Sequence, residues 1–203
     1  TLQSCYGRET DHVCFLELGL SADTTMADSI PELSRLTFLT SSDAHSPSPD
    51  KIGREFTRLL LDEPTFDEVA MALRRHNGRR PVLNVGLDPK MGKYYLSFCS
   101  SCRRTLHFDN DRDMPSFDEL NVYIPVTDSE EARGIVCSIH MRRVRCPACG
   151  KPMRLGVRDR VMMLGTSNSA SPEHRPKYIH IPPLLEMMIT ATGSTKASKK
   201  LLS

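Results

Sequence analysis

The N-terminal part of the chain alternates between apolar runs and polar turns, which predicts alternating strands and helices. The run VCFLELGLS, which starts at Val13, is continuously apolar apart from Glu17 and predicts a buried strand that ends at Gly19. Residues 36–40 are rich in β-branched and aromatic side chains and predict a second strand. The stretch 31–36 predicts a short helix or turn that leads into this strand.

A capping box predicts a helix after these strands. We expect Thr65 to be the N-cap and Glu68 to reach back to the Thr65 amide. The positions that share one face of this helix are apolar, namely Phe66, Val69, Ala70 and Leu73. We expect Gly78 to end the helix. The order of apolar strands, loop and helix predicts the last part of an α/β domain.

Beyond residue 80 the pattern changes to short strands, which we expect at residues 82–85, 94–98 and 121–126. Pro81 and the turn at Gly78 predict a domain boundary near residue 80.

The Ser/Pro-rich stretch 166–176 predicts a linker. It leads to a helix that Pro182 and Pro183 begin, and whose apolar face is expected to serve ordinary packing. That face consists of Leu184, Met187, Met188 and Ala191. We therefore expect three parts, which are residues 1–80, 81–165 and 166–203.

The composition narrows the class of protein. With 203 residues and 39% hydrophobic residues, the chain can bury a core as one domain or as two small ones. No apolar run approaches the roughly 18 residues that a membrane span needs, so we expect a soluble, cytoplasmic protein without a membrane partner. The seven cysteines are an odd number, which argues against a disulfide framework.

Charge is segregated along the chain, although the net charge is only +2. All but one of the charged residues in 109–131 are acidic, whereas all but one of the charged residues in 141–160 are basic. The side chains expected to contact a nucleic-acid backbone are Arg142, Arg143, Arg145, Lys151, Arg154 and Arg158. The alternative is that they only solubilise a small surface. Aromatic residues do not interleave with them, so single-strand or sequence-specific reading is not indicated.

Two C-x2-C pairs predict a metal site. Cys99 with Cys102, and Cys146 with Cys149, can each fold as a knuckle, and two knuckles complete the four-thiolate shell of a structural zinc ion. Gly150 suits the turn after the second pair, because a positive φ costs glycine little. A redox dithiol or chance spacing is the alternative. Substitute ligands are Cys137, His107 and His140, whereas Cys5 and Cys14 are expected to be ordinary thiols.

Asp43 and His45 follow the strand predicted at 36–40. Residues two apart leave the same face of a strand, so we expect the carboxylate and the imidazole to point together. They lie at the carboxyl end of the strand, where α/β proteins place their chemistry, and such a pair suits Zn, Mn or Fe. A solvated turn is the alternative, because Asp, Ser and Pro are turn formers.

Five segments, taken in order, resemble the endonuclease Q family, a group of prokaryotic DNA-repair enzymes built on a PHP (polymerase and histidinol phosphatase) domain. They are ELGLSAD, SSDAHSPSPDKIGRE, LDPKMGKYYLSFCSSC, CPACGKPMRLGVRDRVMML and RPKYIHIPPLLEMM. The resemblance covers about residues 6–190. It implies an α/β fold in which the C-terminal part of a distorted β/α barrel precedes a small β-rich zinc domain and a helical tail.

The resemblance also implies roles for individual residues. Asp43 and His45 match the last metal-ligand motif of the PHP domain, and the four cysteines match the zinc ligands. Glu17, in the segment that matches the family's ETGLS, is a further candidate catalytic residue. The family implies cleavage of DNA on the 5′ side of deaminated bases, such as uracil and hypoxanthine, or of abasic sites. A sliding clamp or another repair factor is a further suggested partner.

The chain departs from the family pattern in three respects. Tyr95 stands where relatives commonly have His, and Arg158 with Asp159 replaces a more hydrophobic pair. The H-x-H motif and the middle ligands of the PHP domain are absent, which suggests that the chain begins inside that domain. We therefore expect the isolated chain to be inactive or severely impaired.

Two other functions fit parts of the pattern. The chain could be a non-catalytic nucleic-acid-binding zinc module on a degenerate PHP remnant, or its metal site could act on a small phosphoester. The basic block and the knuckles argue against a small substrate. Residues 1–80 alone are expected to be poorly soluble, because a partial barrel exposes strand edges.

Overall fold

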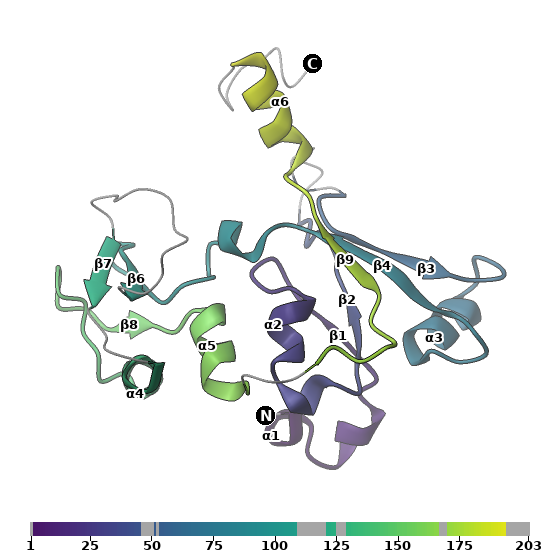
Figure 1. Ribbon diagram of the computed structural model, residues 1–203, viewed down its shortest axis with the longest axis horizontal. Helices are drawn as coiled ribbons and strands as arrows, with labels where there is room; N and C mark the ends of the chain where they lie inside the picture. Colours follow the sequence, from purple (N-terminus) through teal and green to yellow (C-terminus); the bar gives the residue numbers. More distant parts are fainter. Residues whose placement is uncertain are drawn as a thin grey trace.

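The computed structural model describes residues 2–45, 51, 53–108, 121–124, 129–166 and 170–193. These residues form a mixed α/β structure with two groups of strands, as Figure 1 shows. Within the described ranges, no helix is long and apolar enough to cross a membrane. Most of the acidic stretch 109–131 lies outside the described residues.

The first group of strands forms two sheets. Strand β1 (Phe15–Glu17) pairs in parallel with β2 (Thr37–Leu39). The second sheet has the order β3-β4-β9, with β3 (Phe56–Leu60) antiparallel and β9 (Lys177–His180) parallel to the central strand β4 (Arg80–Gly86). The predicted boundary near residue 80 falls at β4. An α/β fold is confirmed, whereas closure into a barrel stays a prediction.

Polar side chains join these two sheets. Asn84 Nδ2 donates to the Phe38 carbonyl at 3.0 Å, and Thr57 Oγ1 donates to Asn84 Oδ1 at 2.9 Å. Directly after β2, the Thr40 hydroxyl donates to the carbonyl of Phe56, a β3 residue that lies opposite Val85 of β4. The contacts therefore advance in the same direction along β2 and β4, and the carboxyl ends of both strands lie at one edge.

Helical turns cover one face of the β1–β2 pair. Helix α1 (Leu2–Tyr6) and the 3-10 turn η1 (Gly7–His12) precede β1 in the chain, and helix α2 (Thr24–Asp28) and the 3-10 turn η2 (Pro31–Leu33) lie between β1 and β2. Ala27 packs with Leu36 and Phe38 in a small core. The opposite face is open, and Phe15 is 45% exposed. The prediction of a buried strand over 13–19 was therefore wrong in its burial and its length, because only one face is covered.

Helix α3 (Phe66–Arg74) begins as the sequence predicts, with Thr65 Oγ1 accepting from the Glu68 amide. The second half of the predicted capping box is wrong. The Glu68 carboxylate instead accepts from the Asp62 amide at 2.9 Å and pairs with Arg79. The helix also ends before Gly78, because Arg75 adopts the left-handed conformation at its C-cap.

The stretch 170–176 is not a free linker in the structure. Arg175 forms a buried ion pair with Asp28 at 2.7 Å and also donates to carbonyl groups of residues 33–36. Residues 167–169 of the predicted linker lie outside the described part. The stretch leads directly into β9, a strand that the sequence pattern did not predict.

Helix α6 (Leu184–Thr192) follows β9 and extends away from the strands, as Figure 1 shows. Its apolar face is exposed within the described part of the chain, where Leu184 is 66% and Met187 is 45% exposed, so ordinary packing for this face stays a prediction. No side chain of the helix is buried.

The second group of strands forms a small module with the order β7-β6-β5-β8. Its elements are β5 (Phe98–Cys99), β6 (Thr105–Phe108), β7 (Asn121–Ile124), helix α4 (Ser129–His140) and β8 (Met153–Arg154). Cys99 and Cys146 belong to its buried core, with Leu106, Val136 and Met153. The strand predicted at 94–98 is wrong for residues 94–97, which follow the turn η3 (Pro89–Met91).

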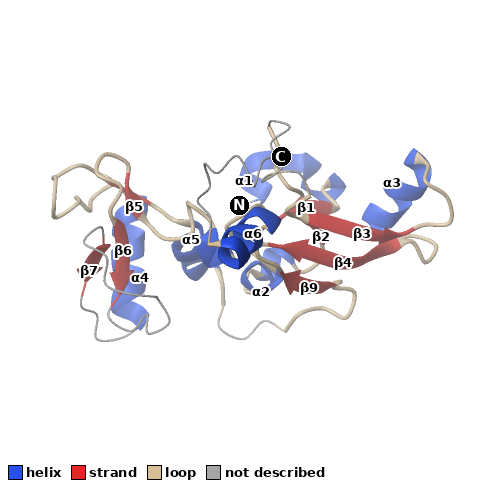
Figure 2. Cartoon of the chain, turned by 90° about the horizontal axis from the view of Figure 1, so that it is seen from above, coloured by secondary structure: helices blue, strands red, loops and turns tan. Residues whose placement is uncertain are grey.

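Helix α5 (Val157–Leu164) lies between the two groups of strands in both views (Figures 1 and 2). Its first two amides donate to the carbonyls of Tyr94 and Tyr95 at 2.9 Å. Because these carbonyls serve the orphan donors at the start of the helix, residues 94–97 cannot act as a regular strand there. The buried carboxylate of Asp159 accepts from the Ser97 amide at 3.0 Å.

Candidate metal centres

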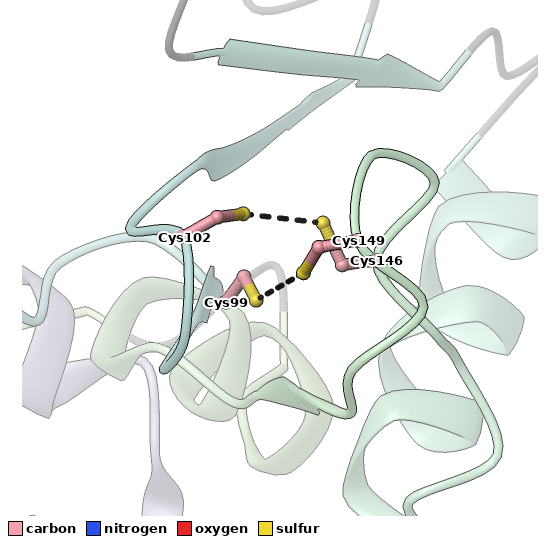
Figure 3. A group of neighbouring side chains, drawn as sticks. All are labelled: Cys99, Cys102, Cys146 and Cys149. Atoms are coloured by element: carbon pink, nitrogen blue, oxygen red, sulfur yellow. Dashed lines mark hydrogen bonds between the residues drawn. The ribbon is translucent and has the colours of Figure 1, made fainter.

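The four predicted cysteines meet in the second module. The ligand atoms of Cys99, Cys102, Cys146 and Cys149 all lie within 4.8 Å of one another. Figure 3 shows them facing a common point, with Cys99 Sγ 3.5 Å from Cys149 Sγ and Cys102 Sγ 3.6 Å from Cys146 Sγ. Tetrahedral zinc–sulfur bonds of about 2.3 Å place sulfur atoms roughly 3.8 Å apart. The arrangement therefore fits a metal such as zinc.

Local hydrogen bonds shape each knuckle in the same way. The Cys99 amide donates to the Arg104 carbonyl at 2.8 Å, and the Arg103 amide donates to the Cys99 carbonyl at 3.0 Å. In the second knuckle the Cys146 amide donates to the Lys151 carbonyl at 2.7 Å, and the Gly150 amide donates to the Cys146 carbonyl at 2.8 Å. Arg103 and Gly150 both have positive φ, at 66° and 69°. The expected turn at Gly150 is present, and the first knuckle adopts it with an arginine.

The thiols do not share one protonation state. The Arg104 amide and side chain, with contacts to the other cysteines, lower the pKa of Cys102 to about 6. The Lys151 amide lowers the pKa of Cys149, but contact with Cys99, burial and the remaining cysteines raise it to about 11. One thiolate thus forms readily, whereas further negative charge in the cluster needs a cation. Metal binding would release the remaining protons.

Most of the predicted nucleic-acid contacts are accessible. Five of the six predicted side chains are exposed on the module that holds the four cysteines, namely Arg142, Arg143, Arg145, Lys151 and Arg154. Arg158 differs, because its guanidinium pairs with the buried Asp159 at 2.8 Å and lies over the rings of Tyr95 and Phe108. Two of the residues that depart from the family pattern, Tyr95 and Arg158, therefore contact each other.

The structure places Asp43 and His45 together in the loop after β2. His45 Nδ1 lies 3.0 Å from the Asp43 carbonyl oxygen and 3.6 Å from its carboxylate. When Nδ1 carries the hydrogen and donates to this carbonyl, Nε2 keeps its lone pair for a metal, as metal-binding histidines commonly do. Asp43 has a positive φ of 47°, which Asp tolerates better than most residues.

Glu17 lies at the end of β1, on the same edge of the strands. Its carboxylate accepts from the hydroxyl of Ser41, which follows β2. A pocket of about 560 Å³ opens there, and its walls include Glu17, Ser41, Ser42 and Glu55. Glu17 and the start of the Asp43 loop therefore border one pocket.

Sequence reasoning missed Glu55, which directly precedes β3 and is only 2% exposed. Burial raises the pKa of Glu55, and nearby Glu17 raises it further, although the Leu87 amide and Arg54 act in the opposite direction. A single acid in the polar stretch before an apolar strand carries no distinctive spacing. No sequence signal therefore singled it out.

The donor types of Asp43 and His45 fit a divalent metal, but the pair supplies two ligands. Within the described residues, the cysteine cluster is the only group that brings three or more ligand atoms within 4.8 Å of one another. Asp43 and His45 are also 58% and 80% exposed. The second centre is therefore a partial site.

Comparisons of the sequence found relatives but no matching family model. An uncharacterized protein of Methanocaldococcus jannaschii is 35% identical over 209 residues, which cover 99% of this chain and 22% of that protein. An uncharacterized protein of Bacillus subtilis is 35% identical over 170 residues, which cover 83% of this chain and 35% of the relative. The chain thus spans about a fifth to a third of these two proteins.

Two solved structures match the whole chain. The lesion-specific endonuclease Q of Pyrococcus furiosus is 35% identical with a TM-score of 0.72. A second endonuclease Q structure, a complex with a 27-mer duplex that carries an abasic lesion at the active site, is 34% identical with a TM-score of 0.75. Both matches cover 100% of this chain and 43% of the other. The resemblance to endonuclease Q is confirmed.

Proposed function

We propose that this chain is part of a metal-dependent, lesion-specific DNA endonuclease, because all of the chain matches a part of endonuclease Q. The proposed reaction is hydrolysis of the phosphodiester bond on the 5′ side of a deaminated base, such as uracil or hypoxanthine, or of an abasic site. The single observation that carries the proposal is the match of this whole chain to 43% of the endonuclease Q structure that has an abasic lesion at its active site.

The proposed reaction centre is the edge where β1 and β2 end, in the C-terminal part of a PHP-type domain. Its residues are Glu17, Asp43 and His45, and their position agrees with the general placement of chemistry in α/β folds. When bound, a divalent Zn, Mn or Fe ion there supplies a hydroxide near neutral pH and neutralises charge on the attacked phosphate. Asp43 and His45 Nε2 would hold the ion, and Glu17 would be a further carboxylate of the catalytic site.

The zinc module has a different role in this proposal. Four thiolates leave no open position on a tetrahedral ion, so we assign the ion a structural role. The exposed basic side chains around the second knuckle are proposed to contact DNA phosphates. Binding would then weaken with salt, because each neutralised phosphate releases counterions.

We expect this chain alone to be inactive or severely impaired. Asp43 and His45 supply two ligands, and the described residues place no third ligand atom beside them. The chain spans 43% of the endonucleases it matches, so further ligands would come from outside the matched region. The proposed activity therefore needs metal ligands beyond the two that Asp43 and His45 supply.

A non-catalytic nucleic-acid-binding zinc module is the second candidate function. The high exposure of Asp43 and His45 favours it, because a loosely held pair binds metal weakly. Under this alternative the basic surface and the cysteine site keep their roles, and the edge at β1 and β2 has none.

A chimera tests the proposed function. This chain replaces the matched 43% of the Pyrococcus furiosus enzyme, and nicking is measured on duplexes that carry an abasic site, uracil, hypoxanthine or no lesion. A matched chimera carries Asp43→Ala and His45→Ala. We expect the first chimera to nick the lesion duplexes only, and the second to lose at least a hundredfold in rate.

Zinc content and thermal melting of both chimeras show whether the swap has folded. A folded chimera without nicking activity contradicts the proposal, and so does equal activity in the double variant. Metal analysis of the isolated chain adds an independent reading. One zinc per chain in both the parent and the double variant favours the binding module, whereas extra metal that disappears in the double variant favours the enzyme.

A further inference from the structure

The pocket at the carboxyl ends of β1 and β2 has one polar end that the proposed roles do not explain. Glu17 and Glu55 contribute carboxylates, and Ser41, Ser42 and Thr57 contribute hydroxyl groups. Among the described residues that line the pocket, none is a lysine, arginine or histidine. Hard oxygen donors with an excess of negative charge are the donor set that Mg²⁺ and Mn²⁺ prefer.

Glu55 is the buried member of this set. It is 2% exposed, and its Oε1 accepts from the Leu87 amide at 2.8 Å. Its Oε2 is buried and has no hydrogen-bond partner. A buried oxygen that stays unpaired lowers the stability of the folded state, so a ligand in the pocket that Glu55 lines would stabilise the protein by pairing with this atom.

Tyr178 of β9 brings a second unpaired oxygen close to the Glu55 carboxylate. Its hydroxyl is buried without a partner. A Cβ atom on Gly86 would lie 2.2 Å from this hydroxyl and 3.0 Å from Glu55 Oε1. Gly86 therefore leaves the room in which the phenol and the Glu55 carboxylate group approach each other.

We propose that Glu55 and Glu17 hold a hydrated hard divalent cation, Mg²⁺ or Mn²⁺, beside the Asp43–His45 pair. Glu55 Oε2 supplies the buried anionic contact, and the Tyr178 hydroxyl donates to Glu55 or to a water of the ion. The cation site itself follows from the pocket, whereas its use at a phosphate rests on the proposed function. The site adds an oxygen-ligated ion to the mixed oxygen–nitrogen pair.

Titration of the zinc-loaded chain with Mn²⁺ tests this inference, with electron paramagnetic resonance of free Mn²⁺ as the readout. We expect Glu55→Gln to weaken Mn²⁺ binding about 10- to 100-fold, the range typical for loss of a group that supports a metal. Glutamine keeps the Oε1 acceptor for the Leu87 amide, so the melting temperature without Mn²⁺ should stay within about one degree. Glu17→Gln, at an exposed position, gives a second reading.

Unchanged Mn²⁺ affinity in Glu55→Gln, or in Glu17→Gln should the first variant not fold, overturns the inference. The absence of Mn²⁺ binding to the parent chain overturns it as well. Asp43→Ala with His45→Ala separates the two ideas. If only that double variant loses Mn²⁺, the pair of the proposed function stands and the Glu55 site falls. If only Glu55→Gln and Glu17→Gln lose it, the Glu55 site stands without the pair.

Discussion

The guanidinium of Arg175 holds together segments that lie 147 positions apart in the chain. Its side chain is 4% exposed and that of Asp28 is 3% exposed, and the ring of Phe38 lies 3.4 Å below the guanidinium. Ser171 adds a hydrogen bond to the same carboxylate at 2.6 Å. Stretch 170–176 is therefore fixed to α2 by Arg175 and Ser171, and to the residues before β2 by Arg175.

Removing the charge of Asp28 should leave Arg175 buried and unpaired. We expect Asp28→Asn to lower the free energy of unfolding by about 3–5 kcal/mol, measured by urea denaturation of the zinc-loaded chain. The exposed pair of His12 and Glu9, 3.8 Å apart, provides the control. Glu9→Gln should change the free energy by less than about 1 kcal/mol. Equal losses in both variants would contradict the role given to Arg175.

At the scale of elements, helices differ in how much of their start is encoded locally. Thr65 caps α3 through an amide three residues away. The start of α5 has no capping side chain of its own, and its amides find carbonyls in residues 94–95. Local motifs therefore revealed the first helix and missed the second.

The ion pair of α3 predicts a dependence of stability on pH. The Arg79 side chain and the Asp62 amide hold the pKa of Glu68 below its ordinary value of 4.5. A carboxylate with a lowered folded pKa stabilises the protein above its unfolded pKa, and this contribution disappears as the pH falls through the folded pKa. The urea concentration at the midpoint of unfolding should therefore decrease when the pH is lowered below about 4.5, and this decrease should be smaller in Glu68→Gln.

Glu63→Gln, at an exposed neighbouring position, is the control for this titration and should keep the pH dependence of the parent chain. A parallel pH profile for Glu68→Gln and the parent would show that the pair with Arg79 does not contribute.

At the scale of the molecule, two bodies have separate cores. The core of the zinc module includes two of the four cysteines, whereas Ala27, Leu36 and Phe38 form a core beside β1 and β2. Loss of the metal should therefore affect the stability of the two bodies unequally.

Gly156, which directly precedes α5, allows the start of this helix to approach the Leu96 backbone closely, since a Cβ there would lie 2.1 Å from it.

Removal of zinc with a chelator should unfold the module of β5–β8 and α4 first. We expect the amides of Cys99 and Cys146 to lose hydrogen-exchange protection, because without the ion no bond joins the two knuckles to each other. Amides in the β3–β4 pairing should keep their protection. A uniform loss over both bodies would contradict independent cores, and Cys5→Ser should behave as the parent does.

The sequence by itself determined the features that local spacing encodes. Each C-x2-C pair, the turn at Gly150, the Thr65 cap and the strand before Asp43 depend on residues within a few positions of one another, whereas the meeting of the two cysteine pairs depends on the tertiary structure. Short-range hydrogen bonds or strand geometry leave few alternatives in these cases. Asp43 and His45 also lie close together, but in a loop where Asp43 has a positive φ of 47°, so the strand alternation from which we expected this does not apply.

The tertiary structure alone decided the contacts between distant segments. Glu55 reaches the pocket of Glu17, and Arg175 reaches Asp28, because separate strands and turns pack side by side. The apolar face of α6 is likewise exposed because no described segment covers it, and the spacing of its apolar residues does not reveal this. Burial and pairing depend on neighbours that are remote in the chain, and spacing within one segment carries no information about them.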